Sequence, residues 1–273
     1  MTATELSHAS RKRAIAGIGR VIVWPGASIW IGRNVGLVRE HAHHAIQVSL
    51  ALEGRFRIRA SGWSGWRDAT AVVIQPDRPH ALDGCGTAVA TLFVEPNSLQ
   101  GAALRARFAG HDVALLGRDE CEQAVAGIRE QFNADAPDGL VAQYARGAIC
   151  RIAGDPAAGP SSDPRITSAI GWMREHLAEP LRLRRVAEAV HLSPGRFRHL
   201  FVSQTGTSFR AWLLWARAEA AIAAATHGVS WTEAAQGAGF ADAAHFTRTC
   251  RRVFGIAPTM LVFANEHSGN GQR

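Results

Sequence analysis

The chain has 273 residues, of which 47% are hydrophobic and 19% are charged, so it is long enough for two ordinary domains with hydrophobic cores. This composition excludes a globally disordered chain, and no apolar run approaches the length of a membrane-spanning helix. Basic residues exceed acidic ones by seven, and residues 163–273 hold 13 basic against 8 acidic side chains, which favours a polyanionic partner such as nucleic acid.

The cysteines and the N-terminal segment bear on the compartment. Four cysteines lie far apart without a CxxC pair, which indicates reduced thiols rather than a disulfide framework or a zinc site. The first residues, MTATELSHASRKR, are not followed by an apolar run of signal-peptide length. We therefore expect a soluble, cytoplasmic protein that has no membrane partner.

The chain from about residue 20 to residue 95 has the pattern of short β-strands. Runs rich in Val, Ile and Phe are separated by Gly, Pro and Asp, and RFRIRA (55–60) alternates strictly between apolar and basic residues. Many short strands at regular spacing predict an antiparallel β-barrel or sandwich. We place this unit, with the helices that follow it, at residues 15–153.

After Pro96 the periodicity becomes helical. Apolar residues recur at steps of three and four, as in Ala124, Ile128 and Phe132. Such a stripe can pair two subunits into a homodimer, and burial within one chain would produce the same stripe. Residues 154–164, GDPAAGPSSDP, are typical of a linker.

From residue 165 to about 264 the chain is expected to be all helical, and it contains a repeat. VAEAVHLSPGRFRHLFVSQTG (186–206) resembles AAQGAGFADAAHFTRTCRRVFG (234–255) at an offset of 48 to 49 residues. Each copy is a short helix, a tight turn and a second helix, with Ser193 or Asp242 as N-cap and a glycine at its end. This pattern predicts two helix-turn-helix units, at 183–206 and 231–255.

Residues 208–226 join the two units as one helix about 28 Å long. DNA repeats its major groove every ~34 Å, so such a rod could hold two helices in consecutive grooves. The repeat therefore predicts that one chain reads two adjacent segments of double-stranded DNA.

LSPGRFRHLFVSQTG, GFADAAHFTRTCRRVFG and the closing GIAP resemble the AraC/XylS family of bacterial transcription regulators. The resemblance implies a DNA-binding domain at residues 165–264, a partnership with RNA polymerase and, most commonly, activation of transcription. It implies DNA contacts by the residues of the two second helices, which are Ser193, Gly195, Arg196, Arg198, His199, Ala243, Ala244, His245, Arg248, Arg251 and Arg252.

Among these positions the arginines are the expected readers of sequence. Arg196, Arg198 and Arg248 could each pair with guanine O6 and N7, whereas glycine and alanine are too small to do so. Arg251 and Arg252 lie further along and are expected to contact phosphates. For Arg182, Arg184 and Arg185 (together, the basic run of the first unit), phosphate contacts and plain surface charge remain equal interpretations.

Residues 20–95 resemble the cupin barrel, which regulators of this family often use as a sensor of small molecules. Metal-binding cupins carry histidines and a carboxylate at the spacing of His41, His43, Gln47 and His80, with glutamate at the third position. A neutral amide is a poor ligand for Zn, Fe, Ni or Cu. Three interpretations stay open, namely a divalent metal held by the histidines, an effector pocket and histidines without a ligand.

Four tryptophans are unusual for a small barrel. Trp24 and Trp30 are candidate effector contacts, and Trp63 and Trp66 share the same pattern, although core packing would explain them equally well.

The sequence thus predicts an α+β multidomain protein with a cupin-like barrel and a C-terminal all-α domain. We expect a DNA-binding transcription regulator that responds to an unidentified effector, without enzymatic activity and without an obligatory cofactor. Two alternatives remain, namely a metal-dependent cupin enzyme fused to a DNA-binding domain and an architectural DNA binder without an effector.

Overall fold

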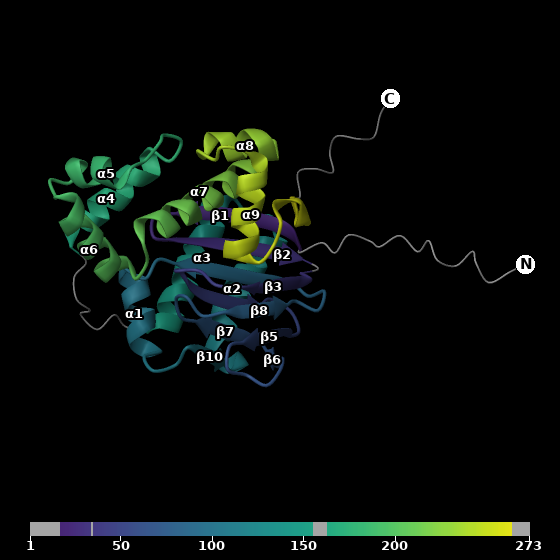
Figure 1. Ribbon diagram of the computed structural model, residues 1–273. Coiled ribbons are helices and arrows are strands. Elements are labelled where there is room, and N and C mark those ends of the chain that lie inside the picture. Colours follow the sequence, from purple (N-terminus) through teal and green to yellow (C-terminus); the bar gives the residue numbers. More distant parts are fainter. Residues whose placement is uncertain (1–16, 34, 155–162, 264–273) are drawn as a thin grey trace, which may run out of the picture.

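Two β-sheets and three helices form the N-terminal half of the protein. The computed structural model describes residues 17–33, 35–154 and 163–263 (Figure 1). The start of the predicted barrel unit and most of the predicted linker therefore lie outside the described residues. The large sheet has the order β10-β7-β4-β9-β2-β1-β11, and the small sheet has the order β3-β8-β5-β6. The strands of this half are β1 (Gly17–Trp24), β2 (Ala27–Arg33), β3 (Leu37–His41), β4 (Ile46–Ala51), β5 (Phe56–Ala60), β6 (Arg67–Ala69), β7 (Ala71–Ile74), β8 (His80–Asp83), β9 (Val89–Val94) and β10 (Val113–Leu116).

The burial of β4 and β5 follows from their places in the sheets. In β5, Phe56 and Ile58 point into the space between the sheets, while Arg57 and Arg59 point to solvent. Strand β4 lies between β7 and β9 and is buried along its whole length. Its apolar residues face the helices, and its polar residues Gln47 and Ser49 are buried away from that core. This alternation places a polar wall inside the barrel.

Three helices cover the outer face of the large sheet, namely α1 (Leu99–Arg107), α2 (Arg118–Asn133) and α3 (Asp138–Ala153). The stripe of Ala124, Ile128 and Phe132 is buried in the same hydrophobic cluster as strand residues such as Ile29 and Leu50. Packing within one chain accounts for this stripe, so the homodimer stays a prediction. None of the described helices is both long and apolar enough to cross a membrane.

The C-terminal half contains six helices in the described residues, which lie together on one side of the barrel (Figure 1). They are α4 (Pro164–Glu175), α5 (Leu183–Ala189), α6 (Pro194–Thr205), α7 (Phe209–Thr226), α8 (Trp231–Gly237) and α9 (Ala243–Phe254). Helices α5 and α6 form one helix-turn-helix unit, here called the first unit, and α8 and α9 form the second unit. The predicted fold class, a barrel domain followed by an all-α domain with two such units, is confirmed.

The caps of α6 and α9, here called the reading helices, follow the expected chemistry. The Ser193 hydroxyl oxygen accepts from the Arg196 backbone N–H at 3.3 Å, and an Asp242 carboxylate oxygen accepts from His245 N–H at 2.6 Å. Gly206 and Gly255 end the helices with φ of 75° and 69°, in the left-handed region that favours glycine. Both helices therefore start and stop where the sequence indicates.

The prediction that the chain is helical to about residue 264 is wrong at its end. After Ile256 the chain forms the 3-10 helix η1 (Pro258–Met260) and the strand β11 (Leu261–Phe263). Strand β11 pairs in parallel with β1, the edge of the large sheet. An unpaired sheet edge offers backbone donors and acceptors, and this tertiary contact overrides the local helical pattern.

The two halves are joined by a backbone hydrogen bond and by side chains as well as by β11. The backbone N–H of Arg39 donates to the Gly255 carbonyl oxygen at 3.2 Å. Arg174 of α4 donates to a carboxylate oxygen of Glu95 at 2.5 Å and of Glu219 at 3.4 Å. Both carboxylates are buried, and burial, opposed by Arg174, raises the pKa of Glu219. The guanidinium therefore compensates two negative charges at the domain boundary.

Candidate nucleic-acid interface and barrel cavity

Helix α6 presents one polar and one apolar face. Phe197 and Phe201 are fully buried and pack in the core of the first unit. The predicted contacts on this helix are all exposed, namely Ser193, Gly195, Arg196, Arg198 and His199. Burial of the two phenylalanines fixes the helix so that these side chains face solvent, as a groove-reading helix requires.

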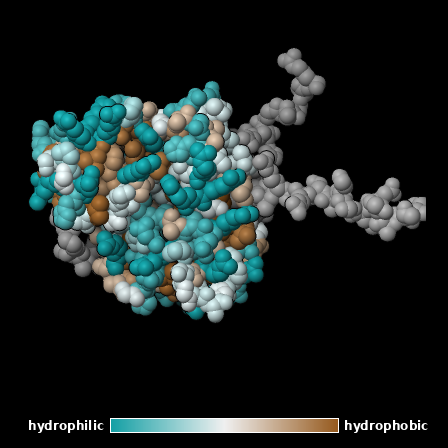
Figure 2. All heavy atoms as spheres, in the orientation of Figure 1, coloured by the Kyte–Doolittle hydropathy of each residue, from teal (hydrophilic) through white to brown (hydrophobic). Residues whose placement is uncertain are grey.

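Helix α9 repeats this arrangement. Phe246 and Cys250 are buried. Of the predicted contacts, Ala243, Ala244, Arg248, Arg251 and Arg252 are exposed, and His245 is half-buried. Figure 2 shows hydrophilic side chains gathered over this helix. Cys250 fits the core as a small apolar side chain, and burial raises the pKa of its thiol.

The arginines of the reading helices differ from their neighbours in their partners. Arg184 pairs with Glu188 at 2.8 Å and Arg185 with Glu179 at 2.5 Å, so acidic neighbours compensate part of the basic run of the first unit. The five predicted DNA-contacting arginines form no ion pair with an acidic side chain within the part of the chain that the structure describes. Their positive charge is left for an external anion.

Helix α7 connects the two units as a rod of 18 residues, about 27 Å long. Trp212 and Leu213 pack into the core of the first unit, and Trp215 and Ile222 pack into the core of the second. Because both cores hold the same helix, the distance between α6 and α9 is set by rigid packing.

The second unit shares a cleft of about 530 Å³ with the barrel. His245, Arg248 and Arg252 of α9 line one side, and His44 and Asp77 of the barrel line the other. Part of the predicted DNA-contacting surface of α9 therefore lies beside the barrel.

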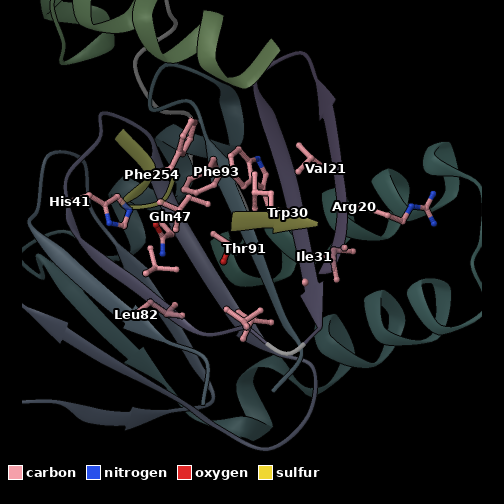
Figure 3. A pocket seen from close by; sticks show the side chains of 17 residues that line it. Arg20, Val21, Trp30, Ile31, His41, Gln47, Leu82, Thr91, Phe93 and Phe254 are labelled. Atoms are coloured by element: carbon pink, nitrogen blue, oxygen red, sulfur yellow. The ribbon is translucent and has the colours of Figure 1, made fainter. Parts of the chain in front are cut away.

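A second, smaller cavity of about 100 Å³ lies inside the barrel. Figure 3 shows side chains from both sheets and from the end of α9 around it. Its walls are formed by Gly19, Arg20, Val21, Trp30, Ile31, Gly32, Val35, Val38, His41, Gln47, Leu82, Val89, Thr91, Phe93, Phe254, Ile256 and Leu261. The last three residues belong to the C-terminal half, so the cavity is closed by both domains.

The structure divides the predicted effector residues between different places. Trp30, His41 and Gln47 line the barrel cavity. His43 lines the cleft beside α9, and His80 does not line the cavity but lies within hydrogen-bond distance of Gln47, which does.

The assignment of Trp24 to the effector site is wrong. Its ring is buried in the core between the large sheet and the helices, where the Arg146 guanidinium lies 5.3 Å from the ring centre. Trp30 of β2 pairs with Val21 of β1, so these two side chains point to the same side of the sheet. Trp24 lies three residues after Val21 on β1, where side chains alternate, and therefore points to the opposite side. Trp63 and Trp66 lie outside the cavity as well, within 4.1 Å and 5.3 Å of arginine side chains.

Three buried histidines and Gln47 form a cluster, here called the histidine cluster. The Nδ1 atoms of His41, His43 and His80 lie 2.8–2.9 Å from backbone carbonyl oxygens, which only accept hydrogen bonds. Each Nδ1 therefore donates a proton, and each neutral ring keeps an unprotonated Nε2. These rings lie close together in tilted or edge-to-face arrangements, with the centres of His41 and His80 4.3 Å apart.

Gln47 lies between two of these rings. Its side-chain oxygen Oε1 lies 2.9 Å from His43 Nε2 and 3.0 Å from His80 Nε2, and its amide NH₂ group donates to the Ser49 hydroxyl oxygen at 3.0 Å. Because Oε1 and both Nε2 atoms are acceptors, the network without a cation is satisfied when the amide is flipped, so that its NH₂ group donates to the two rings and the Ser49 hydroxyl donates to Oε1. A cation among the Nε2 atoms would satisfy the rings equally.

Burial keeps these histidines uncharged. It lowers the pKa of His43 and His44 to about 3, and it lowers the pKa of His80 to about 4. The pKa of His41 is also well below its usual value, first by burial and then by the neighbouring histidines. Neutral imidazoles are the form that binds transition metals.

The cluster fits a divalent metal in part. His41, His43 and His80 each offer one nitrogen, and these atoms lie within 4.8 Å of one another. Backbone carbonyls that hold Nδ1–H are the usual support of ligating histidines. A metal held by the three Nε2 atoms would supply Lewis acidity, while Gln47 provides a neutral oxygen where a carboxylate would bind more strongly.

Sequence reasoning missed the cavity residues contributed by Phe93, Phe254, Ile256 and Leu261. The rings of Trp30 and Phe254 lie 4.6 Å apart between centres, and those of Phe93 and Trp215 lie 5.1 Å apart. The apolar pattern of GIAPTMLVF (255–263) was a usable signal for a buried segment, but it does not say which surface the segment covers.

Comparison with known proteins supports the interpretation of the C-terminal half. Residues 186–262 match the protein family described as "Helix-turn-helix domain". Over 100 residues the chain is 31% identical to the uncharacterized HTH-type transcriptional regulator YpdC of Escherichia coli (strain K12), which covers 36% of this chain and 35% of that protein. Over 102 residues it is 30% identical to the arabinose operon regulatory protein of the same organism, covering 37% and 35%. The matches thus span about a third of the length of these relatives.

Two solved structures share the arrangement of both halves. Unsaturated fatty acid bound wild-type ToxT from Vibrio cholerae strain SCE256 matches with a TM-score of 0.55 and 10% identity over 87% of this chain and 93% of that chain. ToxT from Vibrio cholerae O395 matches with a TM-score of 0.53 and 10% identity, over 85% and 95%. At this identity the likeness shows the fold.

Proposed function

We propose that this chain, whose residues 186–262 match a helix-turn-helix family, is a sequence-specific transcription regulator of the AraC type that responds to a small molecule. We expect it to bind double-stranded DNA and to work in the cytoplasm. Activation of transcription in partnership with RNA polymerase is the expected role, because it is the commoner one in the family. A homodimer is part of the same proposal.

The observation that carries this proposal is the pair of reading helices on one rod. Helices α6 and α9 each expose arginines that have no acidic partner in the described ranges of the chain, and α7 fixes the spacing between these helices. Arginine pairs bidentately with guanine in the major groove, so Arg196, Arg198 and Arg248 are the proposed base contacts. Arg251 and Arg252 are the proposed phosphate contacts.

The barrel cavity is the proposed effector site. It lies between the two domains, and Phe254, at the end of α9, forms part of its wall. ToxT, which shares the fold, has been solved with an unsaturated fatty acid bound. A ligand that favours one packing of α9 on the barrel would shift the population of DNA-binding states, and a difference in affinity of about 1–3 kcal/mol suffices for a 5–150-fold response.

Selection of binding sites from random double-stranded DNA with the full chain tests the DNA-binding part. The selected site should contain two short conserved blocks. Arg248→Ala should cost about 1–3 kcal/mol on this site and relax the preference in one block, and Arg198→Ala should do the same in the other. Arg251→Ala should weaken binding to all sequences alike and lower the salt dependence. Equal losses on every sequence from all three variants would refute the assignment.

A further inference from the structure

The barrel cavity has one polar wall, and most of its polar atoms are already paired. Gln47 contacts His43 and His80 through its amide, and the Thr91 hydroxyl lies 3.0 Å from the Ser49 hydroxyl. The buried indole N–H of Trp30 has no hydrogen-bond partner within the described part of the chain. The site therefore offers a small number of hydrogen-bonding positions in an otherwise apolar space.

Among the described residues, the cavity provides no free partner for a charged ligand. Of the described residues that line it, Arg20 is the one permanently charged side chain. Its guanidinium donates to the Ala136 carbonyl oxygen at 2.7 Å and pairs with Asp138, and Figure 3 shows it pointing away from the other labelled side chains. Moving an unpaired carboxylate or ammonium group out of water into such a space is strongly unfavourable.

The shape of the cavity favours a ring. Trp30 and Phe254 lie 4.6 Å apart between ring centres, Trp30 and Phe93 lie 5.4 Å apart, and all three line the cavity. Its volume of about 100 Å³ is smaller than the ~150 Å³ apolar cavity that accepts benzene in another protein. A ligand with one ring and a short substituent therefore requires a small displacement of the cavity wall, and a long chain requires a much larger one.

We propose that the effector of this barrel is a small uncharged molecule with one ring and one hydrogen-bonding group, and that carboxylates and amines are excluded. This proposal rests on the proposed function, since it names the ligand class of the same site. Because Phe254, Ile256 and Leu261 close the cavity, such a ligand contacts the C-terminal half directly.

Binding of four matched probes to the full chain tests the proposal. Benzyl alcohol, toluene, benzoate and benzylamine share one ring and differ in polarity and charge at pH 7.5. We expect benzyl alcohol, which supplies the hydrogen-bonding group, to bind more tightly than toluene, and both to bind at least tenfold more tightly than benzoate and benzylamine by titration calorimetry and to raise the melting temperature. Benzoate or benzylamine binding as tightly as benzyl alcohol would overturn the proposal, as would the absence of binding by all four.

A pair of variants locates the binding site. Leu82→Phe adds volume at the cavity wall and should weaken the neutral probes at least fivefold, while Leu104→Phe, at a buried position between α1 and the large sheet, should leave their affinity unchanged. Equal affinities in the two variants would overturn the assignment to this cavity. If Leu82→Phe does not fold, the order of the four probes on the unmodified chain still decides the charge preference.

DNA binding is measured in the same preparations, so the two proposals can fail separately. If the charged probes bind more tightly and binding to the selected DNA site is intact, the proposed ligand class is overturned and the proposed function stands. If the neutral probes bind more tightly and the chain binds no DNA, the ligand class is supported and the proposed function is contradicted.

Discussion

The two helix-turn-helix units differ in how they form their cores. The core of the first unit is built from residues of α4 to α7, such as Phe197, Phe201 and Trp212. The core of the second unit also includes Val21 and Phe93 of the barrel. The repeat in the sequence therefore gives two similar units with unequal surroundings.

This difference suggests where a signal from the barrel enters the DNA-binding half. A change in the barrel cavity reaches α9 through direct packing, since Phe254 belongs to both α9 and the cavity wall. Helix α6 shares no hydrophobic cluster with the barrel among the described residues, and the first unit reaches the barrel through α7, which packs on both units, and through the ion pair of Arg174 with Glu95. We expect the second unit to respond to an effector first.

The largest expected effects come from truncating one phenylalanine in each core. Phe201→Ala and Phe254→Ala should each lower the free energy of unfolding by about 3–5 kcal/mol, because both rings are buried. Hydrogen exchange should then differ between them. Phe201→Ala should speed exchange in residues 163–226, and Phe254→Ala should also speed it in β1 and β2. Identical exchange maps would remove the distinction between the units.

The next effect is a loss of stability in mild acid. The buried histidines His43, His44 and His80 have pKa values of about 3 to 4, against 6.5 for an ordinary histidine. The unfolded chain therefore binds protons first as the pH falls. The contribution of these neutral histidines to the free energy of unfolding is fully present above pH 6.5 and decreases as the pH falls towards their pKa values in the folded chain. Each histidine should cost about 2 kcal/mol of this free energy between pH 7 and pH 5.

Urea unfolding at pH 7 and pH 5, with a chelator present, measures this loss. His80→Gln should reduce the difference in the free energy of unfolding between pH 7 and pH 5 by the contribution of one histidine. Exchange at pH 5 should rise in the barrel and the second unit before it rises in the first unit. A stability that does not change between pH 7 and pH 5 would contradict the neutral, buried state of the cluster.

The smallest effect compares the two terminal glycines. Both have positive φ, so alanine at either position costs about 1 kcal/mol in backbone strain. A Cβ on Gly206 would meet no atom of the described residues within 4 Å, but a Cβ on Gly255 would lie 2.3 Å from the Arg39 carbonyl oxygen. Gly255→Ala should therefore be clearly more destabilising than Gly206→Ala in thermal unfolding. Equal losses would mean that the second unit does not pack on the barrel as described.

The sequence predicts the second half better than the first because its signals are local. N-caps at Ser193 and Asp242 and the terminal glycines lie within a few residues of the helices that they define, and the structure reproduces those helices. The repeat adds a second copy of each signal. Fold class and the exposure of the reading helices could therefore be expected from the residues alone.

The cavity and the domain contact could not be predicted in the same way. Trp24 and Trp30 look alike in the sequence, and the phase of strand β2 relative to β1 decides which of them faces the cavity. The role of Leu261 depends on the pairing of β11 with β1, more than 240 residues apart in the chain. Such contacts follow from tertiary packing, which local propensity does not encode.

The central claim is that α6 and α9 of one chain enter adjacent major grooves on one face of the duplex. Hydroxyl-radical footprinting of the full chain on its selected DNA site tests it most directly. We expect two protected tracts about 10 base pairs apart on one face of the helix, with Arg198→Ala weakening one tract and Arg248→Ala weakening the other. A single protected tract per chain, unaffected by one of these substitutions, would contradict the account.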